Sequence, residues 1–324
     1  MKGLQAPPKE DTPARIAARM AVLVVLLIMF AIFIWAAVTN QQIPLVEDLR
    51  IDTVGGLQFE VTEGATFRVD DRGDGETPVF LLHDANLAGG AMFESLVNSL
   101  EGQARTVAVD LPGFGFSTRF PFEGPVHTVS GMAERLIPVI EARSGGPVVL
   151  VGVGIGGKVA AELAASRPDL VAGLVMIDTD FYDDHSGWVQ AFERMPWLGT
   201  AVTHAFEVSG AFSDSSRHPY CEEGGHCLTL QQSRVRSLAE EVAGTTHSLQ
   251  AFRSTPAAAI VPSRLVDITA PTVVVWSTKG KVSEDSVDRL VEGVAGASLE
   301  TLEVFEAIHE APDQVAALIT GLIP

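Results

Sequence analysis

Cysteine, tyrosine and basic residues are scarce in this sequence. Its 324 residues include two cysteines, two tyrosines and only 22 Lys and Arg against 41 Asp and Glu, which gives a net charge of -19 at pH 7. So few cysteines exclude a small scaffold that depends on several disulfides. The shortage of basic residues argues against a nucleic-acid-binding protein, whose affinity would come from clustered Lys and Arg. We therefore expect no nucleic-acid partner.

Charged residues are also absent from one long apolar run. Residues 20–38 read MAVLVVLLIMFAIFIWAAV, which is about the length that crosses a bilayer as a helix. A cleaved signal peptide would have a shorter apolar core and a cleavage site between small residues. The run therefore predicts one retained transmembrane helix that contacts the lipid bilayer. The N-terminus should be cytoplasmic and the body extracytoplasmic, because basic residues precede the run: Lys2, Lys9, Arg15 and Arg19.

The two cysteines lie close together in HPYCEEGGHC. An extracytoplasmic location favours a disulfide between Cys221 and Cys227. Two alternatives remain open. The thiols are free, or His218 and His226 join them in a metal site whose spacing is not a usual zinc pattern.

The remaining sequence alternates strand-like and helix-like segments. This order predicts an α/β fold with a mostly parallel sheet, right-handed crossovers and helices on both faces. A helical, aromatic-rich stretch interrupts the alternation and is predicted to form a cap. The predicted division is a basic N-terminus at 1–19, the transmembrane helix at 20–38, a stalk at 39–56, the first part of the core at 57–180, the cap at 181–262 and the second part of the core at 263–324.

Four glycines follow one of the predicted strands, within residues 148–168. Gly152, Gly154 and Gly157 have the G-x-G-x-x-G spacing of a dinucleotide site, and Asp178 ends the next strand, where an acid would hold the ribose. Two considerations weaken this hypothesis of an oxidoreductase. The strand is the third or fourth of its sheet rather than the first, and an extracytoplasmic body meets no nicotinamide pool.

The same stretch also nearly matches the sequence motif of a phosphate-binding loop. Gly152, Gly157 and Lys158 fit G-x-x-x-x-G-K, but Val159 follows where a Ser or Thr should hold magnesium. We therefore expect no bound nucleotide and no other cofactor.

A third interpretation rests on segments in addition to the glycine turn. In chain order, the sequence contains FLLHDANLAGGAMFESLVNSL, VAVDLPGFGFS, LVGVGIGGKVAAELAASRPDLVAGLVMID, APTVVVWS and LETLEVFEAIHEAPDQVAALI. From about residue 57 to 324 these segments resemble the α/β-hydrolase superfamily. The resemblance implies an α/β-hydrolase-like sheet with a helical cap insertion. It also implies that the glycine turn is the nucleophile elbow of that fold.

In such an elbow the motif is G-x-S-x-G, and the backbone N–H after the serine helps to bind the oxyanion. Carried onto this sequence, the nucleophile position is Gly154, which has no side chain to attack with. The oxyanion-like loop consists of Asp84, Ala85 and Ile155. A carboxylate at Asp84 opposes the stabilisation of a developing negative charge, so an orientation away from the site, capping a turn, is the alternative for this side chain.

The other two triad positions also depart from the family pattern. The acid position after the strand TVVVWS is Gly280, although Asp178 or Asp180, after another strand, could orient a histidine in a variant layout. The histidine position is His309 when the last strand is aligned, or Phe305 when the terminal helix is aligned without a gap.

The sequence thus predicts a membrane-anchored, extracytoplasmic protein of hydrolase fold that lacks serine-nucleophile catalysis. We expect it to act as a binding or scaffold subunit, with a protein partner in the membrane or envelope or an apolar small ligand in the cap cleft. The alternative is an atypical hydrolase or lyase in which His309 acts as a general base without a covalent intermediate.

Overall fold

The computed structural model describes most of the α/β body. It covers residues 13–41, 58–62, 64–120, 125–182, 195, 199–200, 203, 229–242, 244–254 and 262–324. Most of the predicted stalk and much of the predicted cap, with Cys221, Cys227, His218 and His226, lie outside the described residues.

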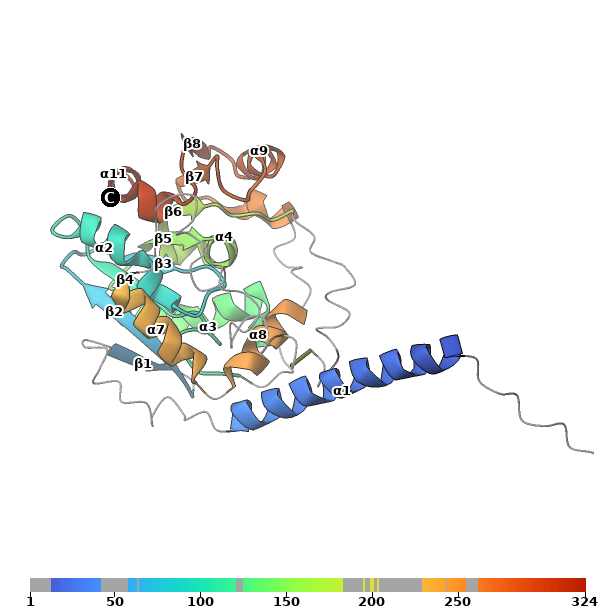
Figure 1. Cartoon of the computed structure of the whole chain (residues 1–324). Helices are drawn as coiled ribbons and strands as arrows, with labels where there is room; N and C mark the ends of the chain where they lie inside the picture. Colours follow the sequence, from blue (N-terminus) through green and yellow to red (C-terminus); the bar gives the residue numbers. More distant parts are fainter. Residues whose placement is uncertain are drawn as a thin grey trace, which may run out of the picture.

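The apolar N-terminal run forms the long helix α1, Pro13–Gln41, which Figure 1 shows as one continuous element. Within it, Pro13–Trp35 is long and apolar enough to cross a membrane, and none of this span is buried in the structure. The helix begins before the predicted start at residue 20, because its backbone hydrogen bonding continues through the residues that precede the apolar run.

The core is an eight-stranded sheet with the order β1-β2-β4-β3-β5-β6-β7-β8. An antiparallel hairpin begins it, and the strands from β4 to β8 are parallel. Gly64 has a positive φ of 77° in the turn of the hairpin, as a tight reversal favours. The strands are β1 Gln58–Thr62, β2 Ala65–Arg72, β3 Val79–Leu82, β4 Thr106–Val109, β5 Val148–Val153, β6 Val171–Ile177, β7 Thr272–Ser277 and β8 Ser298–Leu302.

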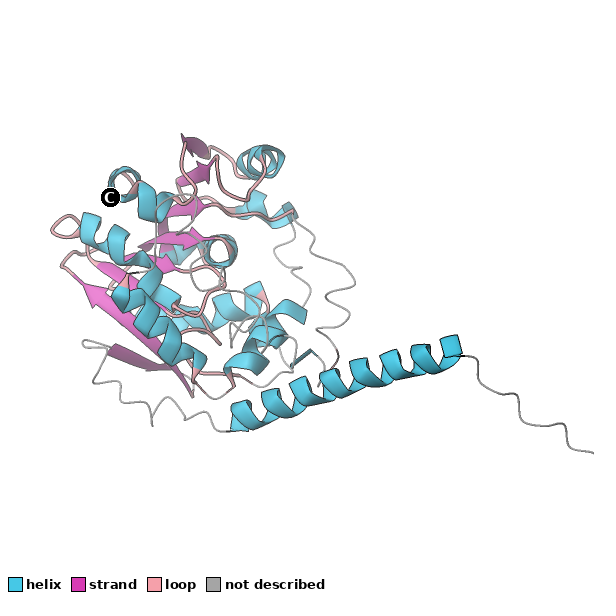
Figure 2. Cartoon of the chain, viewed as in Figure 1, coloured by secondary structure: helices cyan, strands magenta, loops and turns pink. Residues whose placement is uncertain are grey.

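Helices cover both faces of this sheet, as Figure 2 shows. One face carries α3 (Val129–Arg143), α4 (Ile155–Ser166) and α9 (Glu284–Gly293), and the other carries α2 (Glu94–Leu100) and α11 (Pro312–Thr320). The central strands are apolar on both sides because each side packs against a helical layer. This arrangement confirms the predicted fold class.

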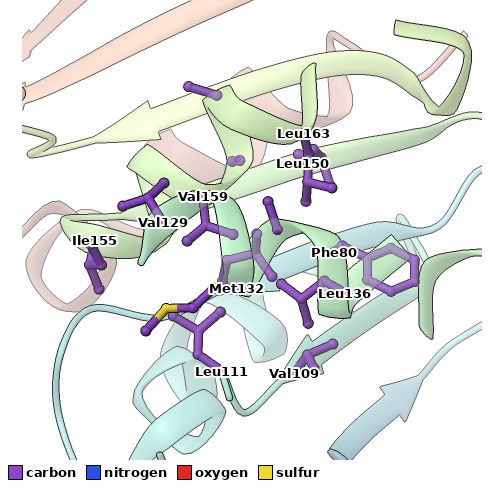
Figure 3. Packing of buried hydrophobic residues seen from close by; sticks show 14 of the residues in the cluster. Phe80, Val109, Leu111, Val129, Met132, Leu136, Leu150, Ile155, Val159 and Leu163 are labelled. Carbon is purple, nitrogen blue, oxygen red and sulfur yellow. The ribbon is translucent and has the colours of Figure 1, made fainter. Parts of the chain in front are cut away.

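The core on the α3 and α4 side surrounds the glycine turn. Figure 3 shows Met132 and Leu136 of α3 packed near Val159 of α4, with Leu150 of β5 in the same cluster. All four side chains are at most 1% exposed. This packing fixes the start of α4 relative to the sheet, which in turn positions the elbow.

The shorter elements complete the body. The 3₁₀ segments are η3 Gly89–Phe93, η4 Pro125–His127, η5 Pro168–Leu170 and η7 Pro262–Asp267. The described helices of the cap region are α7 Leu230–Glu240 and α8 Thr245–Ser254, and α10, Ala307–Glu310, precedes α11.

Arg119 connects helix α8 of the cap region to the core through hydrogen bonds. Its guanidinium donates to the carbonyl oxygens of Phe114, Gly115 and Ser117 in the loop after β4, and to Oγ1 of Thr245 at the start of α8. Burial lowers the pKa of Arg119 to about 10, so its side chain stays charged at neutral pH. These contacts hold α8 beside the carboxyl edge of the sheet.

Candidate functional site

The glycine turn forms a sharp strand-to-helix elbow. Strand β5 ends at Val153, helix α4 begins at Ile155, and Gly154 lies between them with φ 52° and ψ -114°. A residue with a side chain is strained at such a φ, whereas glycine adopts it freely. The elbow geometry is therefore present, but the residue at its apex carries no nucleophile.

The carboxylate of Asp84 fills the space beside Gly154. A Cβ atom added to Gly154 would collide with the Asp84 carboxyl group. Its Oδ1 accepts a hydrogen bond from the backbone N–H of Ile155 at 3.0 Å, and that N–H is the donor expected to bind the oxyanion. The alternative considered for Asp84, an orientation away from the site to cap a turn, is therefore wrong. The side chain turns toward the elbow, because the first N–H of α4 offers it a charge-assisted hydrogen bond.

His83 holds the backbone of this loop in place. Its Nε2 accepts from the backbone N–H of Leu111 at 2.8 Å, which leaves Nδ1 to donate to the carbonyl oxygen of Asp84 at 2.5 Å. Burial is the main cause that lowers the pKa of His83, so the imidazole stays neutral. This histidine is a positioning residue for Asp84.

The neighbouring glycines are required by close packing. A Cβ on Gly152 would meet the backbone of Gly156, one on Gly156 would meet the carbonyl group of Leu82, and one on Gly157 would meet the side chain of Thr179. Backbone and helix approach each other so closely here that only glycine fits. The packing of α4 on the sheet therefore accounts for the glycine spacing without a dinucleotide.

Asp178 lies directly after β6 and connects three segments. Its φ is +46°, in the left-handed region that Asp and Asn tolerate better than most residues. Its Oδ1 accepts from the backbone N–H of Ser277 at 2.7 Å, and its Oδ2 accepts from Ser277 Oγ at 2.6 Å. Ser277 Oγ in turn accepts from the N–H of Ala307 at 3.1 Å. Both oxygens of this variant acid candidate thus hold the ends of β6, β7 and α10 together.

Asp180, the second variant candidate, has a local contact. Its Oδ1 accepts from the backbone N–H of Tyr182 at 2.8 Å, which stabilises the turn that follows β6. This hydrogen bond turns its carboxylate toward the following residues of its own loop.

Replacing Asp178 by asparagine is expected to change how stability depends on pH. Burial, opposed by the Ser277 hydrogen bonds and reinforced by the charge of Asp84, raises the pKa of Asp178. A carboxyl group whose pKa is higher in the folded state stabilises the fold at low pH, where it is protonated. This contribution is lost as the pH rises through the folded-state pKa. We expect the unfolding free energy of the wild type to fall relative to Asp178→Asn as the pH rises above the unfolded-state pKa of about 4.

Urea titrations at several pH values would measure this difference, with Asp180→Asn as the matched control. Asparagine tolerates the backbone conformation and keeps an acceptor for Ser277. A difference between Asp178→Asn and the wild type that stays constant with pH, or changes in the opposite direction, would contradict the burial of an ionisable Asp178.

The predicted acid position lies next to Phe305. A Cβ on Gly280 would approach the carbonyl oxygen of Phe305 at 3.1 Å. Glu310 supports this loop by accepting from the backbone N–H groups of Phe305 and Glu306, at 3.0 and 3.1 Å. His309 lies within α10, where its Nε2 is 3.5 Å from Oε2 of Glu306 and its side chain is 8% exposed.

Sequence reasoning identified Asp84 and Ile155 but not the hydrogen bond between them. It also did not identify Ser277 as the partner of Asp178. One sequence signal could have indicated the position of Asp84. The chain has Gly154 where the family has serine and Asp84 where the family commonly has glycine, and a glycine at 154 leaves room for the larger side chain at 84.

Comparisons with known proteins agree with this architecture. The family model described as alpha/beta hydrolase fold matches residues 78–291. Over 111 residues the chain is 36% identical to Lipase LipV of Mycobacterium tuberculosis. The aligned segment covers 33% of this chain and 41% of that lipase. Over 117 residues it is 30% identical to a pimeloyl-(acyl-carrier protein) methyl ester esterase of Yersinia enterocolitica. The aligned segment covers 36% of this chain and 42% of that esterase. The aligned part is thus about two fifths of the length of these relatives.

Solved structures share the fold over more of the chain. A hydrolase from Pseudomonas aeruginosa has a TM-score of 0.64 at 20% identity, covering 83% of this chain and 98% of its own. An enol-lactonase from Burkholderia xenovorans has a TM-score of 0.64 at 16% identity, covering 82% and 99%. From the strand order and the elbow, together with a family model that matches residues 78–291, it follows that the chain belongs to the α/β-hydrolase fold family.

Proposed function

We propose that this protein is a membrane-anchored binding or scaffold protein that uses the α/β-hydrolase fold without serine-nucleophile hydrolysis. One observation carries the proposal. Where the fold would place a nucleophile side chain, the space next to Gly154 is filled by the carboxylate of Asp84.

This replacement removes two components of acyl transfer. Covalent catalysis needs an activated nucleophile at the apex of the elbow, and glycine supplies none. An oxyanion hole needs free N–H donors aimed at the developing negative charge, and the Ile155 N–H is already bound to Asp84. The remaining carboxylate would repel such a charge. The elbow is therefore better suited to binding than to hydrolysis.

The other triad positions support the same interpretation. The acid position is Gly280, which lies beside the carbonyl group of Phe305 and carries no carboxylate. The acid is thus replaced by glycine, and in the gap-free alignment the base is also replaced, by Phe305. No proton relay of the Ser-His-Asp kind could then operate at these positions.

The N-terminal helix supports membrane anchoring. Its apolar side chains are exposed in the structure, for example Leu26 at 56% and Phe30 at 61%, and a bilayer would remove such surface from water. The basic residues before the apolar run favour a cytoplasmic N-terminus and an extracytoplasmic body. We propose a partner in the membrane or envelope, or an apolar small molecule bound beneath the cap.

The names of the relatives favour a second candidate, an atypical hydrolase. Lipase and esterase are the activities in the names of two proteins that share up to 36% identity with this chain. In this alternative His309 acts as the general base on water without a covalent intermediate.

An ester-hydrolysis assay separates the two candidates. The full chain in lipid nanodiscs would be incubated with p-nitrophenyl butyrate and p-nitrophenyl palmitate, with Lipase LipV as the positive control. We expect rates equal to those of empty nanodiscs, for the wild type and for His309→Ala, because the elbow has no nucleophile. Clear hydrolysis by the wild type that is lost in His309→Ala would overturn the proposal and support the hydrolase.

A further inference from the structure

We propose that strand β8, at one edge of the sheet, binds an extended basic segment of a partner protein, which joins the sheet as a further strand. This inference rests on the proposed function, because it names the surface through which a scaffold protein holds its partner. It follows from three features of β8: its outward-facing backbone groups, its exposed side chains and the acids around it.

Strand β8 ends the sheet and directs part of its backbone away from it. Among the described residues it pairs only with β7, in a continuous register from Ser298 to Leu302. The carbonyl oxygen of Leu302 accepts from the backbone N–H of Thr278, so the backbone groups of Leu302 face β7. Because these groups alternate in direction along a strand, those of Leu299 and Thr301 face outward. They offer the hydrogen bonds that another strand needs.

The side chains of β8 are exposed as well. The first four residues of the strand are exposed and only Leu302 is buried, and Figure 1 shows β8 at the outer end of the sheet. Proteins commonly protect such an edge with a proline, a lysine or a bulge. The strand reads SLETL and pairs without a shift in register, so it has none of these devices. Leu299 adds apolar surface to the edge, with 38% of its area exposed.

The opposite edge of the sheet lacks this combination. On β1, Arg143 of α3 forms a salt bridge with Glu60 at 2.7 Å and donates a hydrogen bond to Oε1 of Gln58 at 3.0 Å. The acid on that edge is therefore neutralised by the protein itself. The comparison identifies β8 as the edge whose charge awaits a partner.

Acids without a basic partner surround β8. Glu300 lies within the strand and Glu303 follows it, while Asp288 and Glu292 lie on α9, the helix that precedes β8. All four are exposed, and in the part of the chain that the structure describes none of them forms a salt bridge. Lys279, which follows β7, lies over an aromatic ring instead. Lys or Arg side chains on an added strand would complement this charge.

A second copy of this chain fits the edge less well than a basic segment does. If two copies paired antiparallel through Leu299 and Thr301, their Glu300 side chains would lie directly opposite each other, and like charges at such positions are destabilising. Each copy would also bring the acids of its own α9 and a net charge of -19. The occupant is therefore a segment of another protein, with Lys or Arg at alternate positions.

The experiment compares two synthetic peptides, acetyl-TKVKVT-amide and acetyl-TEVEVT-amide. Both offer the same backbone hydrogen bonds, and they differ in the sign of two side-chain charges. Binding to the full chain in zwitterionic nanodiscs would be measured by calorimetry, with empty nanodiscs subtracted. We expect the wild type to bind the lysine peptide at least about tenfold more tightly than the glutamate peptide.

Thr301→Pro separates strand pairing from general attraction between a basic peptide and an acidic protein. Proline removes the outward N–H at this position, and an edge strand tolerates it where the N–H faces away from the sheet. We expect Thr301→Pro to bind the lysine peptide at least about tenfold more weakly than the wild type. The matched control Thr301→Val keeps the N–H and a β-branched side chain, and should bind as the wild type does.

A second pair of variants tests the charge. Glu300→Gln removes one of the acids on the edge and should bring the affinities for the two peptides closer together. Asp74→Asn removes an equal charge from an exposed loop after β2 and should leave the preference for the lysine peptide unchanged.

Each other outcome contradicts the inference. It is wrong if neither peptide binds, if both bind equally well, if Thr301→Pro binds as tightly as Thr301→Val, or if Glu300→Gln and Asp74→Asn behave alike. Thermal unfolding would show separately that Thr301→Pro is folded, and Leu299→Pro, at the other outward-facing N–H, replaces it if it is not. Failure of this inference is distinct from failure of the proposed function, which ester hydrolysis by the wild type would reveal.

Discussion

Gly156→Ala is expected to lower the free energy of unfolding by about 3 kcal/mol or more, and to leave little folded protein at moderate urea. The Cβ atom of alanine would overlap the carbonyl group of Leu82 and approach the carbonyl oxygen of His83. Both are backbone atoms at the carboxyl end of β3, so no side-chain rotation relieves the contact. Helix α4 would have to move away from the sheet, which would separate the packed surfaces of α3, α4 and β5.

Urea unfolding of the full chain in detergent would measure this loss. Gly145→Ala is the matched control, because a Cβ at Gly145 meets no atom within 4 Å. We expect the control to stay within about 0.5 kcal/mol of the wild type. An equal, small effect of both substitutions would show that α4 does not pack against β3 as closely as the structure has it.

The fold was predictable from the sequence because its signals are local and repeat along the chain. The parallel sheet followed from the apolar strand-like segments and from the helix-like segments that alternate with them. The N-terminal helix followed from a single uncharged run. Such patterns depend on neighbouring residues, so one sequence is sufficient to recognise them.

The site was only partly predictable. The absence of a nucleophile at Gly154 can be read directly from the motif. The orientation of Asp84 cannot, because Asp84 and Ile155 are 71 residues apart and the choice of rotamer depends on how β3 and β5 pair. The link between Asp178 and Ser277 spans 99 residues and depends on β6 and β7 being neighbours in the sheet.

The predicted disulfide between Cys221 and Cys227 stays a prediction, as does the weaker alternative of a metal site. These residues lie within the predicted cap at 181–262 and outside the described residues. Their pairing would depend on the long-range packing of the cap, and a single sequence carries little information about such packing.

A serine at position 154 is expected to be tolerated only when Asp84 is removed. In the wild-type background the serine Cβ needs the space of the Asp84 carboxyl group. Asp84 must then swing away and lose its charge-assisted hydrogen bond to Ile155, which costs about 2 kcal/mol. The strained backbone conformation at this position adds about 1 to 3 kcal/mol for any residue with a side chain.

In the Asp84→Gly background the first of these costs is absent. Glycine at 84 leaves the space beside the elbow free and uncovers the Ile155 N–H. Gly154→Ser should then cost only the backbone strain of about 1 to 3 kcal/mol. The two substitutions are thus expected to be coupled by about 2 kcal/mol, although residues 84 and 154 are far apart in the sequence.

A double-mutant cycle over Asp84→Gly and Gly154→Ser tests the central claim most directly, namely that Asp84 occupies the place of the missing nucleophile. The free energy of unfolding would be measured in urea for the wild type, both single variants and the double variant. We predict a favourable coupling of about 2 kcal/mol in the double variant. Effects that add to within about 0.5 kcal/mol would show that the two side chains do not compete for one space, and would contradict the claim.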